Sequence, residues 1–282
     1  MDYDLYLSYS GRKTYLTCPK QYEFRYILKD QTKDDPKKSL FGSIIGKVFE
    51  WFYTRQTWTQ CDPVASTLEL IKPAIDCVFR EKNFDPSCDP GFFTVLKQEL
   101  NHFIPLGIEI IRKNSFLTPY SRAEEDLSVI YGNEKRGMTL KIGGRADFIH
   151  SQNRKEVWII DGKGSKHREK YVDSEQLIWY AIQHYIKYHV VPTRLGFMFY
   201  CFPDDPIKWI AYDGDVLHAS LNKTFEVAKK IKLKIFDAAP SENCNRCAYK
   251  NKCDDGIKYS ANKRIESGGR ITDSIFDLER IY

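Results

Sequence analysis

Hydrophobic positions recur at helical spacing through most of the first 115 residues. Four segments carry apolar side chains three or four residues apart, the period of an amphipathic helix, at residues 11–28, 39–56, 62–82 and 91–113. Pro19 interrupts the first of these segments because proline cannot continue a helix through its own position. The pattern therefore predicts a mostly helical N-terminal half.

Beyond residue 120 the pattern changes to short runs rich in β-branched and aromatic residues, separated by Gly and Asn turns. These runs predict strands at residues 123–132, 138–150, 156–161, 194–202 and 207–213. Helical spacing returns at residues 171–188 and 214–236. This order predicts an α/β fold in which one mixed central sheet is flanked by helices.

Composition narrows the class of protein without naming it. The chain has 282 residues, 42% of them hydrophobic, and a net charge of +5, which permits a nucleic-acid partner without requiring one. No apolar run approaches the roughly 20 residues of a membrane span, and the N-terminus lacks a signal-peptide core. We therefore expect a cytoplasmic, reducing location, where the eight cysteines act as metal ligands or buried thiols rather than disulfides.

Two carboxylates and a lysine lie at the ends of two neighbouring predicted strands. If these strands pair through a hairpin loop at residues 150–155, Asp147 and Asp161 approach one edge of the sheet, and Lys163 projects with Asp161. Two carboxylates suit Mg²⁺ or Mn²⁺, which activates water, and a lysine can orient that water. The alternative is a hairpin with ordinary solvated charges, because a D-x-K pattern is short and common.

The helix that follows adds two polar-tipped side chains on one face, Gln176 and Tyr180, at positions i and i+4. The loop between, at residues 164–171, is rich in basic side chains. A basic loop beside two carboxylates is a place where a phosphate backbone could lie, and a solvated turn is the alternative.

Three cysteines near the C-terminus, Cys244, Cys247 and Cys253, are spaced C-x2-C-x5-C. Thiolates so close in sequence converge readily on one metal or cluster, and a fourth must come from elsewhere. Cys18 is the best candidate for that fourth ligand, although a buried thiol is its alternative role. Zinc and an iron–sulfur cluster both suit such a set.

Three pieces of the chain, "GGRADFI", "WIIDGKGS" and "EQLIWYA", resemble the motifs of the PD-(D/E)XK nuclease superfamily, in particular its RecB-type branch. The resemblance implies a restriction-endonuclease-like core. It also implies metal ligands at Asp147, Asp161 and the backbone carbonyl of Gly162, a water-assisting Lys163, and DNA-contacting or site-orienting roles for Gln176 and Tyr180.

The segment "LSYSGRKTYLTCPKQYEFRYI" is similar to the N-terminal segment of iron–sulfur RecB-type nucleases, which include CRISPR-associated exonucleases and AddB-type nucleases. This resemblance implies that Cys18, Cys244, Cys247 and Cys253 hold a [4Fe–4S] cluster that staples the chain ends together. It implies a single nuclease domain, 1–282, made of cluster-binding segments 1–30 and 240–256, a helical region 40–115, a nuclease core 121–236 and a tail 257–282.

One position departs from the family pattern. Gly46 stands in "FGSIIGKVFE" where the family usually has a metal-binding histidine. Glu50, one helical turn later, could reach the same site, and Glu124 or Glu125 could also contribute. A solvated helix residue is the alternative for Glu50.

The sequence therefore predicts a metal-dependent exonuclease acting on single-stranded DNA or DNA ends. The alternative is a catalytically weak or inactive DNA-binding or assembly subunit that keeps the fold and the cluster. A zinc protein of unrelated function is a third reading. A protein partner in a repair, CRISPR or viral replication complex is compatible with such a fold. Tyr9, Tyr15 and Tyr22 are candidates either for stacking bases or for the core.

Overall fold

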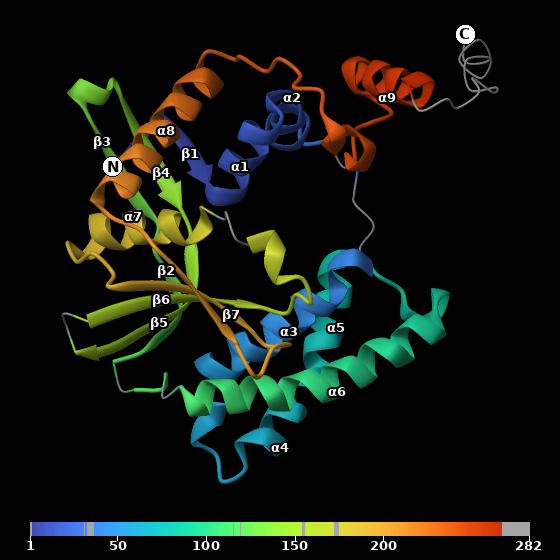
Figure 1. Ribbon diagram of the computed structural model, residues 1–282, viewed down its shortest axis with the longest axis vertical. Coiled ribbons are helices and arrows are strands. Elements are labelled where there is room, and N and C mark those ends of the chain that lie inside the picture. The colour runs from blue at the N-terminus through green and yellow to red at the C-terminus, as the bar shows by residue number, and fades with distance from the viewer. Residues whose placement is uncertain are drawn as a thin grey trace. The chain divides into compact units, whose positions relative to one another are not determined.

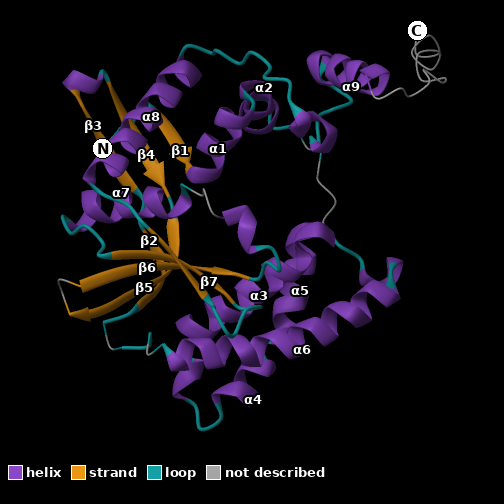
Figure 2. Cartoon of the chain, viewed as in Figure 1, coloured by secondary structure: helices purple, strands orange, loops and turns teal. Residues whose placement is uncertain are grey.

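The computed structural model describes residues 2–30, 32, 37–114, 116–118, 120–153, 156–171 and 175–266 (Figures 1 and 2). The chain divides into two compact units. The first unit consists of residues 1–9 and 35–226, and the second of residues 10–34 and 227–282. Part of the tail predicted at residues 257–282, from residue 267 onward, lies outside the described residues.

The strands described in the first unit form two mixed sheets. The larger has the order β2-β5-β6-β7-β8 and the smaller the order β1-β4-β3. Their bounds are β1 Leu5–Ser8, β2 Arg122–Asp126, β3 Val129–Asn133, β4 Met138–Gly143, β5 Arg145–Asn153, β6 Glu156–Lys163, β7 Arg194–Phe199 and β8 Ile207–Ile210. The mixed α/β prediction is confirmed, and the single central sheet is corrected to two sheets.

The split between the sheets comes from one long hairpin that bends. The pairs Ala123↔Phe148 and Val129↔Ile142 belong to different sheets but keep the same antiparallel register. At the bend Leu127 N–H donates to the Gly144 carbonyl at 2.9 Å. A Cβ at Gly144 would overlap the Gln183 side-chain oxygen, so a larger residue here would require the Gln183 amide to move.

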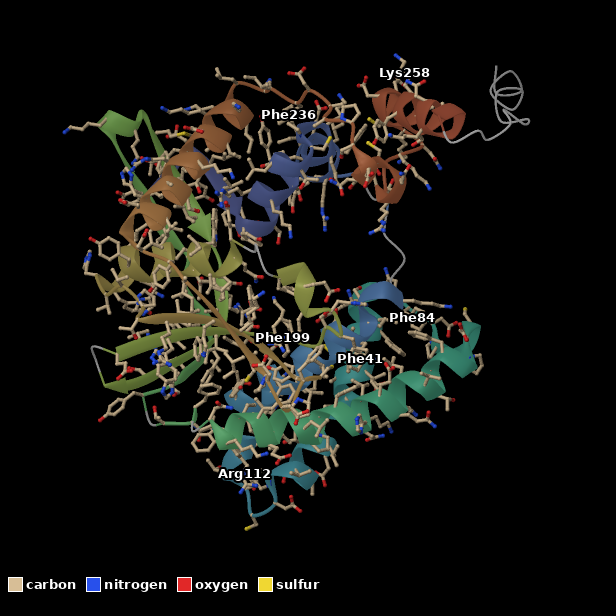
Figure 3. All side chains as sticks on the ribbon, in the orientation of Figure 1. Phe41, Phe84, Arg112, Phe199, Phe236 and Lys258 are labelled. Atoms are coloured by element: carbon tan, nitrogen blue, oxygen red, sulfur yellow. The ribbon has the colours of Figure 1, made fainter. Side chains whose placement is uncertain are left out.

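Helices pack against one face of the five-stranded sheet (Figure 3). The sheet residues Phe148, Ile160 and Met198 belong to one hydrophobic core with the apolar side chains of these helices. These helices are α3 Lys37–Thr54, α4 Pro63–Leu68, α5 Ile71–Lys82 and α6 Pro90–Lys113. The sequence predicted one helix over residues 62–82, and the structure has two. Pro73 explains the break, because its ring excludes the carbonyl four residues earlier from a continuous helix.

Helix α7 (Gln176–Tyr188) connects the parallel strands β6 and β7. Its Trp179 Nε1 donates to the Gly143 carbonyl at 3.1 Å, and Gln183 Nε2 donates to the Ile142 carbonyl at 2.9 Å. Successive side chains of a strand point to opposite faces. Ile160 therefore enters the helical core described above, while its neighbour Asp161 faces α7.

The second unit is built on aromatic packing. The rings of Tyr15 and Tyr22 have centroids 5.6 Å apart, and Tyr22 also stacks on Phe236 at 6.2 Å. Both tyrosines are buried, which confirms the core role rather than base stacking for these two. Its elements include α2 Pro19–Tyr22, the π-helix η1 Glu23–Ile27, η6 Glu242–Arg246 and α9 Asp254–Glu266.

Two further helices, α1 Tyr9–Thr17 and α8 Gly214–Lys232, each run from one unit into the other along the chain. Short 3-10 turns lie at η2 Thr57–Thr59, η3 Pro86–Cys88, η4 Glu134–Arg136 and η5 Arg168–Tyr171. Within the described ranges, no helix combines the length and apolar character needed to cross a membrane.

Candidate active site

The structure brings Asp147, Asp161 and Lys163 together at the end of the β5–β6 pair. The antiparallel register matches Phe148 with Ile160, so one step further along the strands Asp147 lies opposite Asp161. Oδ2 of Asp147 accepts a hydrogen bond from the Gly162 N–H at 2.9 Å. The Lys163 ammonium forms an ion pair with Oδ2 of Asp161.

Gln176, in the first turn of α7, links the charged groups. Its Oε1 accepts from Lys163 Nζ at 3.1 Å, and its Nε2 donates to Oδ1 of Asp161 at 2.8 Å. The same Nε2 lies 3.0 Å from the Tyr180 hydroxyl. An amide offers both an acceptor and a donor, so one glutamine can satisfy a cation and an anion at once. The predicted i, i+4 pair thus faces the predicted D-x-K strand.

Tyr200, a buried residue next to the site, is not predicted from the sequence. A Cβ at Gly162 would overlap the Tyr200 hydroxyl, and the Tyr200 ring stacks on Phe49 of α3 with centroids 4.0 Å apart. The tyrosine is buried and supports the strand directly behind Asp161. Nothing in the local sequence marks it, because Tyr200 follows a strand that only the sheet places beside β6.

Burial disfavours the ionised form of both aspartate side chains. Desolvation raises the pKa of Asp147 well above its usual range, and repulsion from Asp161 raises it further. Desolvation also raises the pKa of Asp161, against the opposing effect of Lys163. Burial alone would lower the pKa of Lys163, but the Asp161 carboxylate outweighs burial and the pKa is raised. The site therefore favours a cation between its carboxylates.

Glu124 is a third carboxylate beside this pair. The neighbouring pairs Ala123↔Phe148 and Glu125↔Ala146 place Glu124 opposite Asp147. Its φ is 51°, in the left-handed region that non-glycine residues rarely adopt. Burial and then the Glu50 charge raise the pKa of Glu124 to about 7.

Glu125 points to other partners. It lies 3.5 Å from the ammonium of Lys187 and 3.3 Å from Arg122 Nη1, and it accepts a hydrogen bond from the Tyr188 hydroxyl. Of the two glutamates considered from the sequence, the structure therefore places Glu124 beside Asp147, with Arg145 Nη1 4.0 Å from its carboxylate, and commits Glu125 to shorter ion pairs.

Glu50 is half-buried and forms an ion pair with Lys47 at 2.6 Å. Its charge raises the pKa of Glu124, so Glu50 lies near Glu124. At Gly46, one turn earlier, a Cβ would meet no atom within 4 Å. Position 46 thus has room for a larger side chain.

No three His, Cys, Asp or Glu side chains in the described ranges are arranged as they stand to hold a metal ion. The chemistry of the Asp147–Asp161 pair nevertheless suits a hard divalent cation. Both groups are oxygen donors, and the pKa of each is raised by burial, so a cation would relieve the desolvation and the repulsion together.

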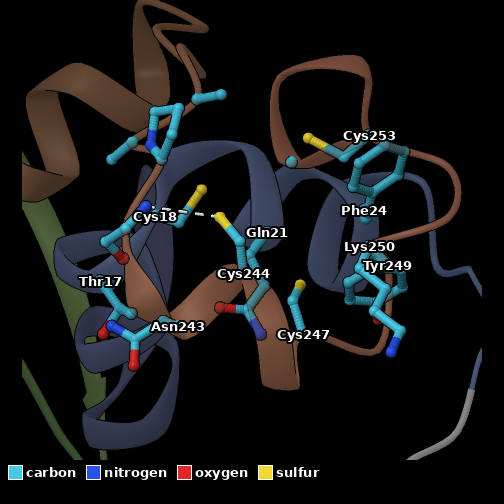
Figure 4. Close-up of a pocket in the computed structure, with 15 residues that line it drawn as sticks. Thr17, Cys18, Gln21, Phe24, Asn243, Cys244, Cys247, Tyr249, Lys250 and Cys253 are labelled. Carbon is cyan, nitrogen blue, oxygen red and sulfur yellow. Dashed lines mark hydrogen bonds between the residues drawn. The ribbon is translucent and has the colours of Figure 1, made fainter. Parts of the chain in front are cut away.

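The four predicted cluster cysteines line one cavity within the second unit (Figure 4). Cys18 stands in extended conformation between α1 and α2, as expected for a residue before proline. Cys244 belongs to η6, Cys247 follows it, and Cys253 precedes α9. Burial raises the pKa of Cys247, and the charges of the other three cysteines add to that effect, so the four thiols lie near one another.

Comparison with known proteins identifies the class to which this fold and site belong. The family model of the PD-(D/E)XK nuclease superfamily matches residues 6–254. A search of the curated proteins gives no match. A solved structure described as "Crystal structure of SSO0001" is similar over 90% of this chain and 88% of its own, at 14% identity and a TM-score of 0.39.

The mixed α/β fold, with paired aspartates and a lysine on adjacent strands, is consistent with the nuclease class that the family model describes. With the family match over most of its length, the chain belongs to the PD-(D/E)XK nuclease superfamily. Family membership implies a nuclease with DNA as its substrate, and Mg²⁺ or Mn²⁺ is the metal such nucleases generally use. The RecB-type iron–sulfur branch stays a prediction.

Proposed function

We propose that this protein is a Mg²⁺- or Mn²⁺-dependent deoxyribonuclease that acts as an exonuclease on single-stranded DNA or DNA ends. One observation carries the nuclease site in this proposal: Gln176 bonds both Lys163 and Asp161, beside Asp147. An ion pair that served only to stabilise the central strand β6 would not need a second buried carboxylate alongside it. The exonuclease action and the preference for single strands or ends rest on the resemblance to RecB-type nucleases.

Each residue then has a definite role. Asp147, Asp161 and the carbonyl of Gly162 would hold the divalent cation, which supplies Lewis-acid stabilisation of the phosphate and lowers the pKa of water. Lys163 orients the attacking water or stabilises charge on the phosphate. Gln176 holds the Lys163 ammonium and the Asp161 carboxylate in fixed positions through one hydrogen bond to each. The Tyr180 hydroxyl in turn accepts a hydrogen bond from the Gln176 amide and orients it.

Glu124 and Glu50 are the proposed additional ligands in the absence of the family histidine. Glu124 is the stronger candidate, because it lies opposite Asp147 and its side chain is only 21% exposed. Glu50 is bound to Lys47 and would have to leave that ion pair to contribute.

For the cysteines we propose a [4Fe–4S] cluster held by Cys18, Cys244, Cys247 and Cys253. The donor set supports this proposal, since four thiols from segments far apart in sequence line one cavity. The cluster would connect residues 1–30 with residues 240–256, as the terminal segments of a single nuclease domain. Zinc is the competing occupant of a four-thiol site.

A second candidate function follows from Gly46. A chain that lacks the family histidine could bind DNA or assemble with partners without cutting. The retained pairing of Asp161 with Lys163, completed by Gln176, favours the enzyme, because a scaffold has no need of these buried charges.

The test is cleavage of single-stranded DNA carrying a 5′ or a 3′ label, by anaerobically purified protein with Mn²⁺. The wild type should cut, Lys163→Ala should lose roughly 10²- to 10³-fold in rate, and Lys141→Ala, a lysine on β4, should match the wild type. Equal cleavage by wild type and Lys163→Ala contradicts the mechanism. No cleavage by folded, metal-supplied wild type favours the binding subunit.

A further inference from the structure

A groove of about 640 Å³ begins at Lys163 and continues away from the aspartates. One side is lined by the start of α3, including Ser39 and Phe41, and by Glu99 of α6. The other side is lined by the segment that follows β6, including Lys166 and His167. The groove is therefore continuous with the ammonium that the proposed function assigns to catalysis.

The segment after β6 is fixed against α3 by a close backbone approach. A Cβ at Gly164 would lie 2.6 Å from Ile45 Cγ2 and 3.2 Å from the Gly42 Cα, so this position accepts only glycine without displacing the helix. The basic segment predicted from the sequence thus forms one wall of the groove instead of a free turn.

Lys166 is the cation that faces across the groove. Its ammonium forms an ion pair with Glu99. It also lies 5.4 Å from the Phe41 ring centroid and 5.5 Å from that of Phe103. Two aromatic rings can hold an ammonium without help from a carboxylate, so Lys166 would keep its position if Glu99 were neutral.

We propose that this groove binds the sugar–phosphate backbone of a single nucleic-acid strand beside the scissile phosphate, and that Glu99 limits its affinity by pairing with Lys166 until a phosphate replaces the carboxylate. The inference rests on the proposed function for its orientation toward the scissile phosphate. The observations that support it, the ion pair of Lys166 with Glu99 and the two rings beside Lys166, do not depend on the metal site. A competing carboxylate keeps binding weak enough for a strand to leave after cleavage.

Binding without cleavage tests the groove. A fluorescein-labelled 20-nucleotide single strand is titrated in EDTA across a series of salt concentrations and followed by anisotropy. Glu99→Gln should lower Kd about fivefold, and Lys166→Ala should raise it about fivefold, the upper range for an exposed charge pair. For a single strand, each phosphate that the protein neutralises steepens the decline of log K with log salt by about 0.7, so the two variants should also differ in slope.

The matched controls lie on α6, the helix that carries Glu99. Glu109 and Lys113 of α6 form an exposed ion pair at 2.8 Å that does not line the groove. Glu109→Gln and Lys113→Ala remove the same charges, and both should leave Kd within twofold of the wild type. In the Lys166→Ala background, Glu99→Gln should lose most of its effect, because the two residues act on each other.

Three outcomes overturn the groove assignment: variants at Glu99 and Lys166 that match their controls, no binding by the wild type, or an equal response with duplex of the same sequence. Failure of the wild type to cleave with Mn²⁺ overturns the proposed function instead. The groove stands if Glu99→Gln still tightens strand binding and Lys166→Ala still weakens it.

Discussion

The backbone N–H of Gly162 donates to Oδ2 of Asp147 at 2.9 Å. This bond couples the centre of the D-x-K strand to the carboxylate of the adjacent strand. Any shift of β6 at Gly162 would therefore move Asp147 relative to Asp161. The position of the carboxylate pair depends on the backbone at Gly162 as well as on the two side chains.

Gly162→Ala tests this dependence. The added methyl group would overlap the Tyr200 hydroxyl, which is held by stacking on Phe49. Overpacking of this kind costs about 1–3 kcal/mol in the free energy of unfolding, and we expect at least a tenfold loss of cleavage. Chemical denaturation and single-turnover cleavage measure the two effects. Adding Tyr200→Phe removes the overlapping oxygen, although the ring carbon Cζ would still lie 2.8 Å from the new methyl group, and should recover part of both losses; no recovery would show that the hydroxyl is not the main obstacle.

Two substitutions of Gln176 separate the loss of its hydrogen bonds from the addition of a negative charge. Gln176→Leu leaves Oδ1 of Asp161 without its donor and Lys163 without one acceptor, at a cost of about 1–3 kcal/mol in stability. Gln176→Glu keeps the shape but places a second anion against Asp161, which raises the pKa of that carboxyl further. The acidic limb of the pH–rate profile should then move to higher pH. An unchanged profile for Gln176→Glu would contradict direct contact with Asp161.

Gly46 offers a gain-of-function test. A side chain there meets open space, so Gly46→His should fold and should bind Mn²⁺ about tenfold more tightly, as measured by calorimetry. Gly46→Ala is the matched control, because alanine in place of an interior helix glycine adds stability of up to about 1 kcal/mol without supplying a ligand. Equal Mn²⁺ affinity for the two variants would remove position 46 from the metal site.

Glu124 predicts how stability without metal depends on pH. The pKa of Glu124 rises from an ordinary 4.5 to about 7 in the fold, chiefly through burial. Between these values the folded chain holds a proton that the unfolded chain has lost, so the free energy of unfolding falls as pH rises from about 4.5 to 7. Urea unfolding of wild type and Glu124→Gln in EDTA at pH 5, 6, 7 and 8 measures this decline, which should be smaller in Glu124→Gln.

Two additions complete that experiment. Glu109→Gln is the control, because Glu109 is exposed and its pKa is lowered, so it stays ionised throughout this range. Saturating Mn²⁺ should stabilise the wild type most at pH 7–8, where protons no longer compete for the carboxylates. Identical pH dependence in wild type and Glu124→Gln would contradict the burial of the Glu124 carboxyl in the fold.

The four cysteines that line one cavity should be required together for cluster content. Cys18→Ala or Cys247→Ala should abolish iron and acid-labile sulfide and markedly lower the Tm of anaerobically purified protein. Cys61→Ala and Cys88→Ala, at exposed positions elsewhere, should retain both. Colourless wild-type protein with one zinc per chain would contradict the iron–sulfur assignment.

The sequence by itself determined the chemistry of the site and the elements that carry it. Asp161 and Lys163 project together because strand side chains alternate with period two, and Gln176 and Tyr180 share a face because helix side chains repeat near every fourth residue. Both relationships are local, so composition and spacing reveal them. The extended conformation of Cys18 is also a local effect, because Pro19 disfavours a helical conformation at the residue before it.

Tertiary structure decided what the carboxylates contact and where the sheet divides. The choice of Glu124 over Glu125, the fit of Tyr200 against Gly162 and the pairing of Glu99 with Lys166 each join residues far apart in the chain. The bend at Gly144 depends on Gln183 of α7 in the same way. Side-chain periodicity carries no information on such distant contacts, because they arise from packing after the elements have formed.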